Sequence, residues 1–166
     1  PESWPREQID EDLDLMVAHG LNTVRVGEFA WSTMEPEEGV YDLSLFREVV
    51  DKCRARGIAV IMCTPSATLP AWMEVNYPEV TMEIDTRKAT HGARRLSCSS
   101  SPRFREFCRK ICHALGKEFG RDDNVIGWQI DNELIAEVGG KGCTCPSCVQ
   151  DFRRYLERRY GTIENL

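Results

Sequence analysis

Three polar residues follow directly on an apolar run, in a pattern that suits acid–base chemistry. Residues 128–133 read WQIDNE, so Asp131, Asn132 and Glu133 end a strand predicted over 125–130. A carboxylate at the end of a buried strand costs free energy unless the site uses it. Partial desolvation raises the pKa of a carboxylic acid, which would suit Glu133 to act as a general acid. The alternative at this point is a solvated loop or helix-cap cluster without a catalytic role.

The cysteines form a second candidate site. Cys143, Cys145 and Cys148 lie within six residues of one another. Such clustering favours a metal over disulfides, and Zn²⁺ binds thiolates tetrahedrally, so three close thiols require a fourth ligand from elsewhere. Free thiols in a reducing compartment are the alternative. The other cysteines in apolar runs are expected to be small buried hydrophobic side chains: Cys53, Cys63, Cys108 and Cys112.

Helices and strands alternate along the chain and would position these residues. Apolar residues at helical spacing predict helices over 6–19, 43–56, 102–119 and 146–160. Short apolar runs predict strands over 23–26, 58–63 and 125–130. The run at 58–63 is almost wholly apolar, which is typical of a strand buried on both faces of a parallel sheet. The alternation predicts an α/β fold.

Two α/β architectures compete. A doubly wound sheet that binds nucleotides would carry GxGxxG or GxxxxGK[ST] after a strand, and the sequence contains neither. Long segments instead follow each predicted strand, over 28–42, 64–101 and 132–146. A (β/α)8 barrel carries its active site on such segments, but a full barrel needs roughly 250 residues. We therefore predict a partial (β/α)8 barrel.

Composition limits the classes of function. The 166 residues, 42% of them hydrophobic, correspond to about one domain and exclude disordered and collagen-like classes. A formal net charge of −6 argues against nucleic acid or an anionic membrane as the main partner. No apolar run reaches the roughly 18 residues of a membrane helix. The first residue is not Met and no signal peptide is visible, so we expect a piece of a longer, cytoplasmic protein.

Several motifs occur in order along all 166 residues. They are residues 1–5 (PESWP), 22–31 (NTVRVGEFAW), 34–39 (MEPEEG), 64–65 (TP), 70–72 (PAW), 94–95 (RR), 128–133 (WQIDNE) and the cysteine cluster. Together they resemble the N-terminal half of the catalytic barrel of glycoside hydrolase family 42, the bacterial β-galactosidases. The resemblance implies that residues 1–166 hold roughly strands 2 to 4 of a TIM barrel with their helices.

The resemblance also implies an activity and roles for particular residues. The complete enzyme would hydrolyse terminal β-D-galactosides with retention of configuration. Glu133 would be the acid/base catalyst after the fourth strand, while Asn132 and Arg94 would contact the galactose, with Arg95 the weaker candidate. A zinc site of four cysteines would consist of Cys98 and the three clustered residues. Its role would be structural, because four protein ligands leave no open position for water.

The second carboxylate of a retaining mechanism would lie on the seventh strand of the family's barrel, outside these residues. We assign that role neither to Asp131 nor to Glu28, which could line the pocket or form a salt bridge to a nearby Arg. We therefore expect the isolated 166 residues to be inactive. Members of the family are often homotrimers, and no nucleic-acid or membrane partner is expected.

Two other interpretations stay open. The chain could be a non-catalytic structural fragment that zinc holds together. It could also belong to another retaining glycosidase of the same barrel clan, although such enzymes have no reason to carry the cysteine cluster. For Trp31 and Trp72 the sequence leaves both a sugar-lining role and a core role, whereas Trp4 and Trp128 are predicted to be core residues.

Overall fold

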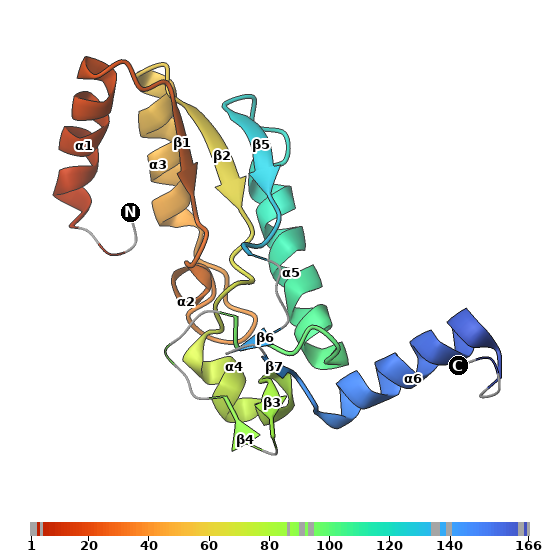
Figure 1. Ribbon diagram of the computed structural model, residues 1–166. Helices are drawn as coiled ribbons and strands as arrows, with labels where there is room; N and C mark the ends of the chain where they lie inside the picture. The colour runs from red at the N-terminus through yellow and green to blue at the C-terminus, as the bar shows by residue number, and fades with distance from the viewer. Residues whose placement is uncertain are drawn as a thin grey trace.

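Three parallel strands form the centre of the molecule. The computed structural model describes residues 3, 5–85, 87–89, 92, 95–133, 137–138, 141–162 and 165, without the side chains of 137, 138 and 141. The strands are β1 (Thr23–Val26), β2 (Ala59–Cys63) and β5 (Val125–Gln129), in the spatial order β1-β2-β5 (Figure 1). In register, Val26 lies beside Met62, and Met62 beside Trp128. The carboxyl ends of all three strands therefore meet at one edge of the sheet.

Helices connect the strands, as parallel pairing requires. The long helices are α1 (Arg6–Ala18), α3 (Ser44–Ala55), α5 (Pro102–Phe119) and α6 (Pro146–Tyr160). All four helices and all three strands agree with the predicted segments to within one residue at each end. At the start of α5, the Ser101 hydroxyl accepts a hydrogen bond from the Phe104 N–H at 3.3 Å, and Pro102 occupies the first helical position.

Short elements fill the long segments after the strands, and the periodicity did not predict them. They are α2 (Trp31–Met34), α4 (Ala71–Asn76), the 3₁₀ turn η1 (Pro78–Val80) and two small hairpins, β3 (Glu83–Ile84) with β4 (Arg87–Lys88) and β6 (Glu137–Val138) with β7 (Lys141–Gly142). Elements of two to six residues are much shorter than the window of roughly 11–18 residues over which a hydrophobic period is recognised.

The core lies between the sheet and the helices α3 and α5. Large side chains that are at most 1% exposed fill it, among them Phe46, Phe107, Ile111, Leu115 and Phe119. Burial of each such side chain contributes about 1.5–3 kcal/mol, so these helix faces hold the sheet in place. In Figure 1 both helices run alongside the strands, whereas α6 extends away from the sheet. No residue of α6 is buried.

Strand β5 leaves apolar side chains exposed, and the prediction of a core position for Trp128 is wrong here. Trp128 is 37% exposed, Ile126 62% and Ile130 68%. Within the described residues β5 pairs with β2 alone and lies at the edge of the sheet, so nothing there covers these side chains. Trp4 lies outside the described residues.

A partly buried ion-pair network joins α3 to the segment before β5. Asp122, whose side chain is 7% exposed, accepts hydrogen bonds from Arg47 at 2.5 Å, from Arg54 and from the Asn124 N–H at 3.0 Å. Burial acts to raise the pKa of Asp122, but the two guanidinium groups outweigh it and lower the pKa to about 2. The network therefore stabilises the fold only where this carboxyl is ionised.

Asp122→Asn should lower the free energy of unfolding by about 2 kcal/mol at pH 7. Because the pKa of Asp122 is depressed on folding, this contribution is present above the unfolded value of about 3.9. It is lost as the pH falls towards 2. Urea unfolding of both proteins at pH 7 and near pH 2 measures it. Asp123→Asn is the matched control, because Asp123 is 98% exposed and should change little. Equal stability of the wild type and Asp122→Asn at pH 7 would contradict the network's role.

Candidate functional site

Polar side chains from the two outer strands, β1 and β5, meet at the carboxyl edge of the sheet. From β1, Arg25 reaches across β2 and donates a hydrogen bond to the Gln129 Oε1 atom at 2.5 Å. The same guanidinium pairs with Glu28 at 2.7 Å, and the Glu28 side chain is 17% exposed. Of the two predicted roles for Glu28, the structure places it in the salt bridge. Side chains of β1 and β5 are thus in contact across the middle strand, β2.

The turn after β5 is tied to the loop after β2. The Asp131 N–H donates to the Thr64 hydroxyl at 2.8 Å, and the Ser66 hydroxyl donates to Asp131 Oδ2 at 2.9 Å. Thr64 and Ser66 are 3% and 7% exposed. The Arg95 guanidinium forms an ion pair with the other carboxylate oxygen, Oδ1. Asp131 is therefore an acceptor held among buried donors.

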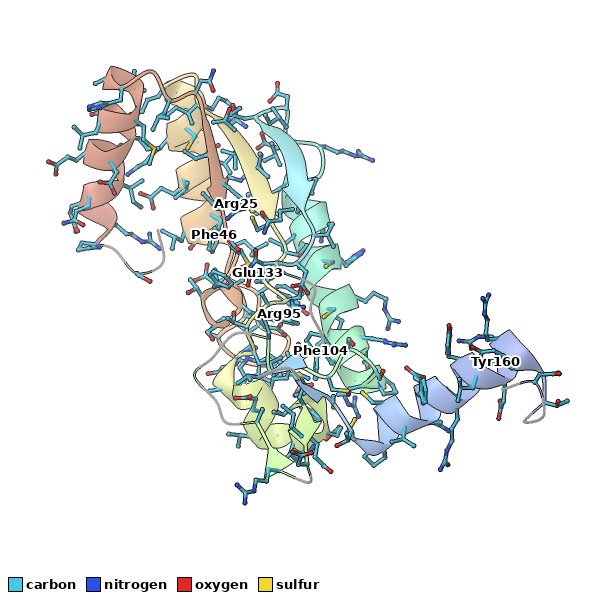
Figure 2. The ribbon with its side chains drawn as sticks, viewed as in Figure 1. Arg25, Phe46, Arg95, Phe104, Glu133 and Tyr160 are labelled. Carbon is cyan, nitrogen blue, oxygen red and sulfur yellow. The ribbon has the colours of Figure 1, made fainter. Side chains whose placement is uncertain are left out.

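Glu133 lies two residues further along this turn. The residue is exposed and has a φ of 48°. Figure 2 shows Glu133 beyond the strand ends, between the labels of Arg25 and Arg95. The partial desolvation expected from the sequence at Glu133 is therefore not seen in the described part of the chain, where the residue is open to solvent. Asn132 precedes it, and its N–H donates to the Asp131 Oδ1 atom at 2.5 Å.

Of the two arginines predicted to lie near the galactose, the structure describes only Arg95. Arg94, the predicted contact to galactose, lies outside the described residues. Arg95, the weaker candidate, has a side chain that is only 17% exposed and contacts Asp131. Its N–H donates to the Ala67 carbonyl at 2.8 Å, which connects the segment before α5 to the loop after β2.

The two tryptophans of the long loops belong to the core. Trp31 is completely buried and donates to the Glu35 carboxylate at 2.8 Å. Trp72 is partly buried, packs edge-on against Phe107 and donates to the Glu35 carbonyl at 2.9 Å. Glu35 is itself 1% exposed and also accepts the Gly39 N–H at 2.9 Å. Sequence reasoning missed this buried carboxylate, although the MEPEEG motif contains it.

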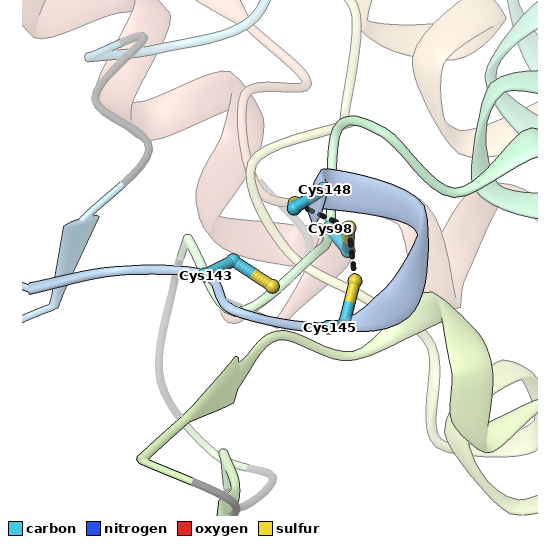
Figure 3. Close-up of side chains that lie close together, drawn as sticks. All are labelled: Cys98, Cys143, Cys145 and Cys148. Carbon is cyan, nitrogen blue, oxygen red and sulfur yellow. Dashed lines mark hydrogen bonds between the residues drawn. The ribbon is translucent and has the colours of Figure 1, made fainter. Parts of the chain in front are cut away.

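Four cysteines converge at a second place, near the start of α6 (Figure 3). The sulfur atoms of Cys98, Cys143, Cys145 and Cys148 all lie within 4.8 Å of one another. Cys98 Sγ is 3.4 Å from both Cys145 Sγ and Cys148 Sγ. A disulfide has sulfurs about 2.05 Å apart, so these thiols are not bonded. Tetrahedral zinc with about 2.3 Å bonds needs sulfurs about 3.8 Å apart, so the four residues fit a metal ion.

The protein holds these thiols in a fixed environment. The Cys98 N–H donates to the Val80 carbonyl at 2.7 Å, and the Glu83 N–H donates to Cys143 Sγ at 3.3 Å. Burial raises the pKa of Cys98, and burial raises that of Cys148 to about 11. Burial acts in the same direction on Cys145, but hydrogen bonds from the Cys148 N–H and neighbouring thiols lower its pKa.

The remaining cysteines follow the prediction in part. Cys53 and Cys63 are fully buried, and burial raises the pKa of each to about 11. Cys108 is partly buried on α5. Cys112 is exposed, so the prediction of burial is wrong there. At about 100° per residue, Cys112 lies further from the centre of the buried stripe than Cys108 does, whereas Ile111 lies near that centre.

Comparison with known proteins decides the family. A family model described as beta-galactosidase, that of glycoside hydrolase family 42, matches residues 1–166. The chain belongs to glycoside hydrolase family 42. Its sequence is 42% identical over 167 residues to beta-galactosidase YesZ of Bacillus subtilis, which covers 100% of this chain and 25% of the relative.

Solved structures of family 42 proteins share the fold. The β-galactosidase of Halorubrum lacusprofundi superposes with a TM-score of 0.92 at 34% identity and covers 99% of this chain and 25% of that one. The enzyme of Rahnella sp. R3 gives 0.91 at 36% identity, with 99% and 24% covered. The predicted fold, part of an α/β barrel, is confirmed. This family 42 chain spans about a quarter of the length of its curated relatives.

In the part of the chain that the structure describes, no helix has the length and apolarity that a bilayer crossing requires.

Proposed function

We propose that residues 1–166 are the N-terminal half of the barrel of a retaining β-galactosidase and carry the acid/base half of its site. One observation carries the proposal: Asp131, Asn132 and Glu133 follow the last strand of a parallel sheet, at the edge where barrel enzymes keep their chemistry. Relatives over 40% identical along the whole chain are named beta-galactosidases. Both support hydrolysis of terminal β-D-galactosides as the activity.

Glu133 would act twice in the reaction. As a carboxylic acid it gives its proton to the glycosidic oxygen while the bond from C1 to that oxygen breaks, and the electron pair stays on the leaving oxygen. A second carboxylate forms a bond to C1. Glu133, now ionised, takes a proton from water as the water oxygen attacks C1, which releases galactose and the second carboxylate. The two carboxyl groups of retaining enzymes are about 5–5.5 Å apart.

The second carboxylate is proposed to lie outside these 166 residues. Within the described part, Glu28 and Asp131 follow the strands β1 and β5, and each forms an ion pair with an arginine. Neither is proposed as the nucleophile, because the family resemblance implies that this carboxylate follows the seventh strand of the barrel, outside these residues. The isolated 166 residues should therefore show no turnover.

The remaining roles complete the proposal. Asn132 and Arg94 would contact the galactose hydroxyls, with Arg95 beside them. Zn²⁺ is the proposed metal at Cys98, Cys143, Cys145 and Cys148, because four thiolates in a tetrahedral arrangement suit it and leave no open position for catalysis. The family resemblance adds a homotrimeric assembly to the proposal, and the free thiols add a cytoplasmic location.

The product's configuration tests the function. The complete protein is incubated with an aryl β-D-galactoside, and the anomer formed first is observed by proton NMR. We expect β-D-galactose first, with the matching β-D-glucoside cleaved much more slowly. An α-anomer as the first product would refute retention, and faster cleavage of the glucoside would favour another glycosidase of the same clan. The isolated 166 residues serve as the control without a nucleophile.

A further inference from the structure

We infer that Asp131 is a positioning residue that holds the Asn132–Glu133 turn and the Arg95 guanidinium in one arrangement. This inference rests on the proposed role of Glu133 as the acid/base. Asp131 itself would not touch the reacting atoms. It would act through the Asn132–Glu133 turn and through the Arg95 guanidinium.

The backbone of the turn requires such support. Asp131 has a φ of 58° and Glu133 a φ of 48°, so two of three consecutive residues lie in the left-handed region. Residues other than glycine occupy that region at a cost in free energy, and they stay there only where surrounding contacts hold them. Glutamate is not among the residues enriched there. The conformation of this turn therefore depends on the contacts that hold its residues, and those of Asp131 are the ones described below.

Asp131 makes those contacts through its backbone as well as its carboxylate. Its N–H donates to the Thr64 hydroxyl at 2.8 Å, and its carbonyl accepts from Gln129 Nε2 at 2.9 Å. Its Oδ2 atom accepts from the Ser66 hydroxyl at 2.9 Å. Because Thr64 and Ser66 are almost fully buried, these partners are fixed by the packing of the loop after β2.

The second carboxylate oxygen joins two further segments. Asp131 Oδ1 accepts from Arg95 and from the Asn132 N–H. Arg95 is in turn anchored by its own N–H, which donates to the Ala67 carbonyl at 2.8 Å, and it has a φ of 67°. The turn after β5, the loop after β2 and the segment before α5 thus meet at one carboxylate. Charge-assisted hydrogen bonds of this kind are about twice as strong as neutral ones.

Loss of this carboxylate should weaken proton transfer more than sugar binding. A general acid must come within about 2.6–3.2 Å of the oxygen that it protonates. A turn that relaxes from its left-handed conformation would move Glu133 out of that range. Substrates with poor leaving groups depend most on the acid, whereas a 2,4-dinitrophenolate leaves without a proton.

The test is the leaving-group dependence of kcat/KM in the complete enzyme with Asp131→Asn. Asparagine keeps the shape but replaces one accepting oxygen with a donor that faces Ser66 or Arg95. We expect kcat/KM to fall about 100-fold for an alkyl β-D-galactoside and by no more than about 5-fold for the 2,4-dinitrophenyl galactoside. A merely structural role would lower both equally, and that result would overturn the inference.

Two further variants distinguish a positioning role of Asp131 from a general loss of stability. Asp122→Asn removes another buried, arginine-paired carboxylate far from the site, and its two substrates should be affected alike. Ser66→Ala removes a single hydrogen bond from Asp131 and should show the same leaving-group bias, smaller in size, even if Asp131→Asn does not fold. Absence of any bias in Ser66→Ala would then refute the positioning role.

Glu133→Gln separates this inference from the proposed function. If Glu133→Gln lacks a leaving-group bias, the proposed acid/base role fails and the inference fails with it. If Glu133→Gln shows the bias while Asp131→Asn behaves like Asp122→Asn, the proposed function stands and the positioning role of Asp131 is refuted.

Discussion

Glu133→Gln in the complete enzyme should lower kcat/KM for alkyl β-D-galactosides by about 1,000-fold. Glutamine has the size of glutamate but no proton to give to the leaving oxygen and no basic oxygen to accept one from water. The fall for the 2,4-dinitrophenyl galactoside should be far smaller, since that leaving group needs no acid. Steady-state kinetics on the two substrates measures the difference.

Azide gives a second measurement on the same variant. Azide is a nucleophile that needs no general base, so it should restore turnover of the dinitrophenyl substrate and yield β-galactosyl azide. Glu48→Gln is the matched control, because Glu48 pairs with Lys52 and with Arg6, at the contact between α3 and α1. Intact hydrolysis of alkyl galactosides by Glu133→Gln would remove Glu133 from the mechanism.

Loss of one cluster cysteine should remove the metal and destabilise this part of the protein. Cys98 is 1% exposed and contacts two of the other three thiols, so Cys98→Ser deletes the ligand that joins the segment before α5 to the start of α6. We expect bound zinc to fall from about one per chain to near zero. A ligand at about 1,000 times its Kd stabilises a protein by about 4 kcal/mol, which sets the scale of the loss.

Elemental analysis and thermal unfolding measure both effects. Cys112→Ser is the control, because Cys112 is exposed on α5 outside the cluster, and it should keep the full zinc content. A strong chelator should reproduce the loss in the wild type and leave Cys98→Ser unchanged. Retention of zinc by Cys98→Ser, or a wild type that binds none with all thiols reduced, would refute the proposed site.

Local patterns were sufficient for the framework of the fold. The strand at β2 and the long helix α5 were predicted to within one residue, because an apolar run and an apolar stripe are properties of neighbouring residues. The Asp-Asn-Glu turn was located for the same reason, since it directly follows β5. The three clustered cysteines indicated a metal from their spacing alone, whereas the assignment of Cys98 came through the family resemblance.

The contacts between side chains could not be predicted from these local patterns. Asp131 had no assigned role in the sequence analysis, and only the structure places it among Thr64, Ser66 and Arg95. Trp31 had two predicted roles until its complete burial against Glu35 was seen. Nothing in the spacing of these residues distinguishes a carboxylate that accepts buried hydrogen bonds from one that faces solvent.

The sequence by itself therefore determined the types and order of the elements, the place of the acidic turn and, through the order of its motifs, the family. The tertiary structure decided which side chains share a site. Cys98 and Cys145 lie 47 residues apart and Ser66 and Asp131 lie 65 apart, yet each pair is in contact. Such contacts depend on how the helices pack onto the sheet and bring its loops together, and that packing is a sum over the whole core that no local pattern contains.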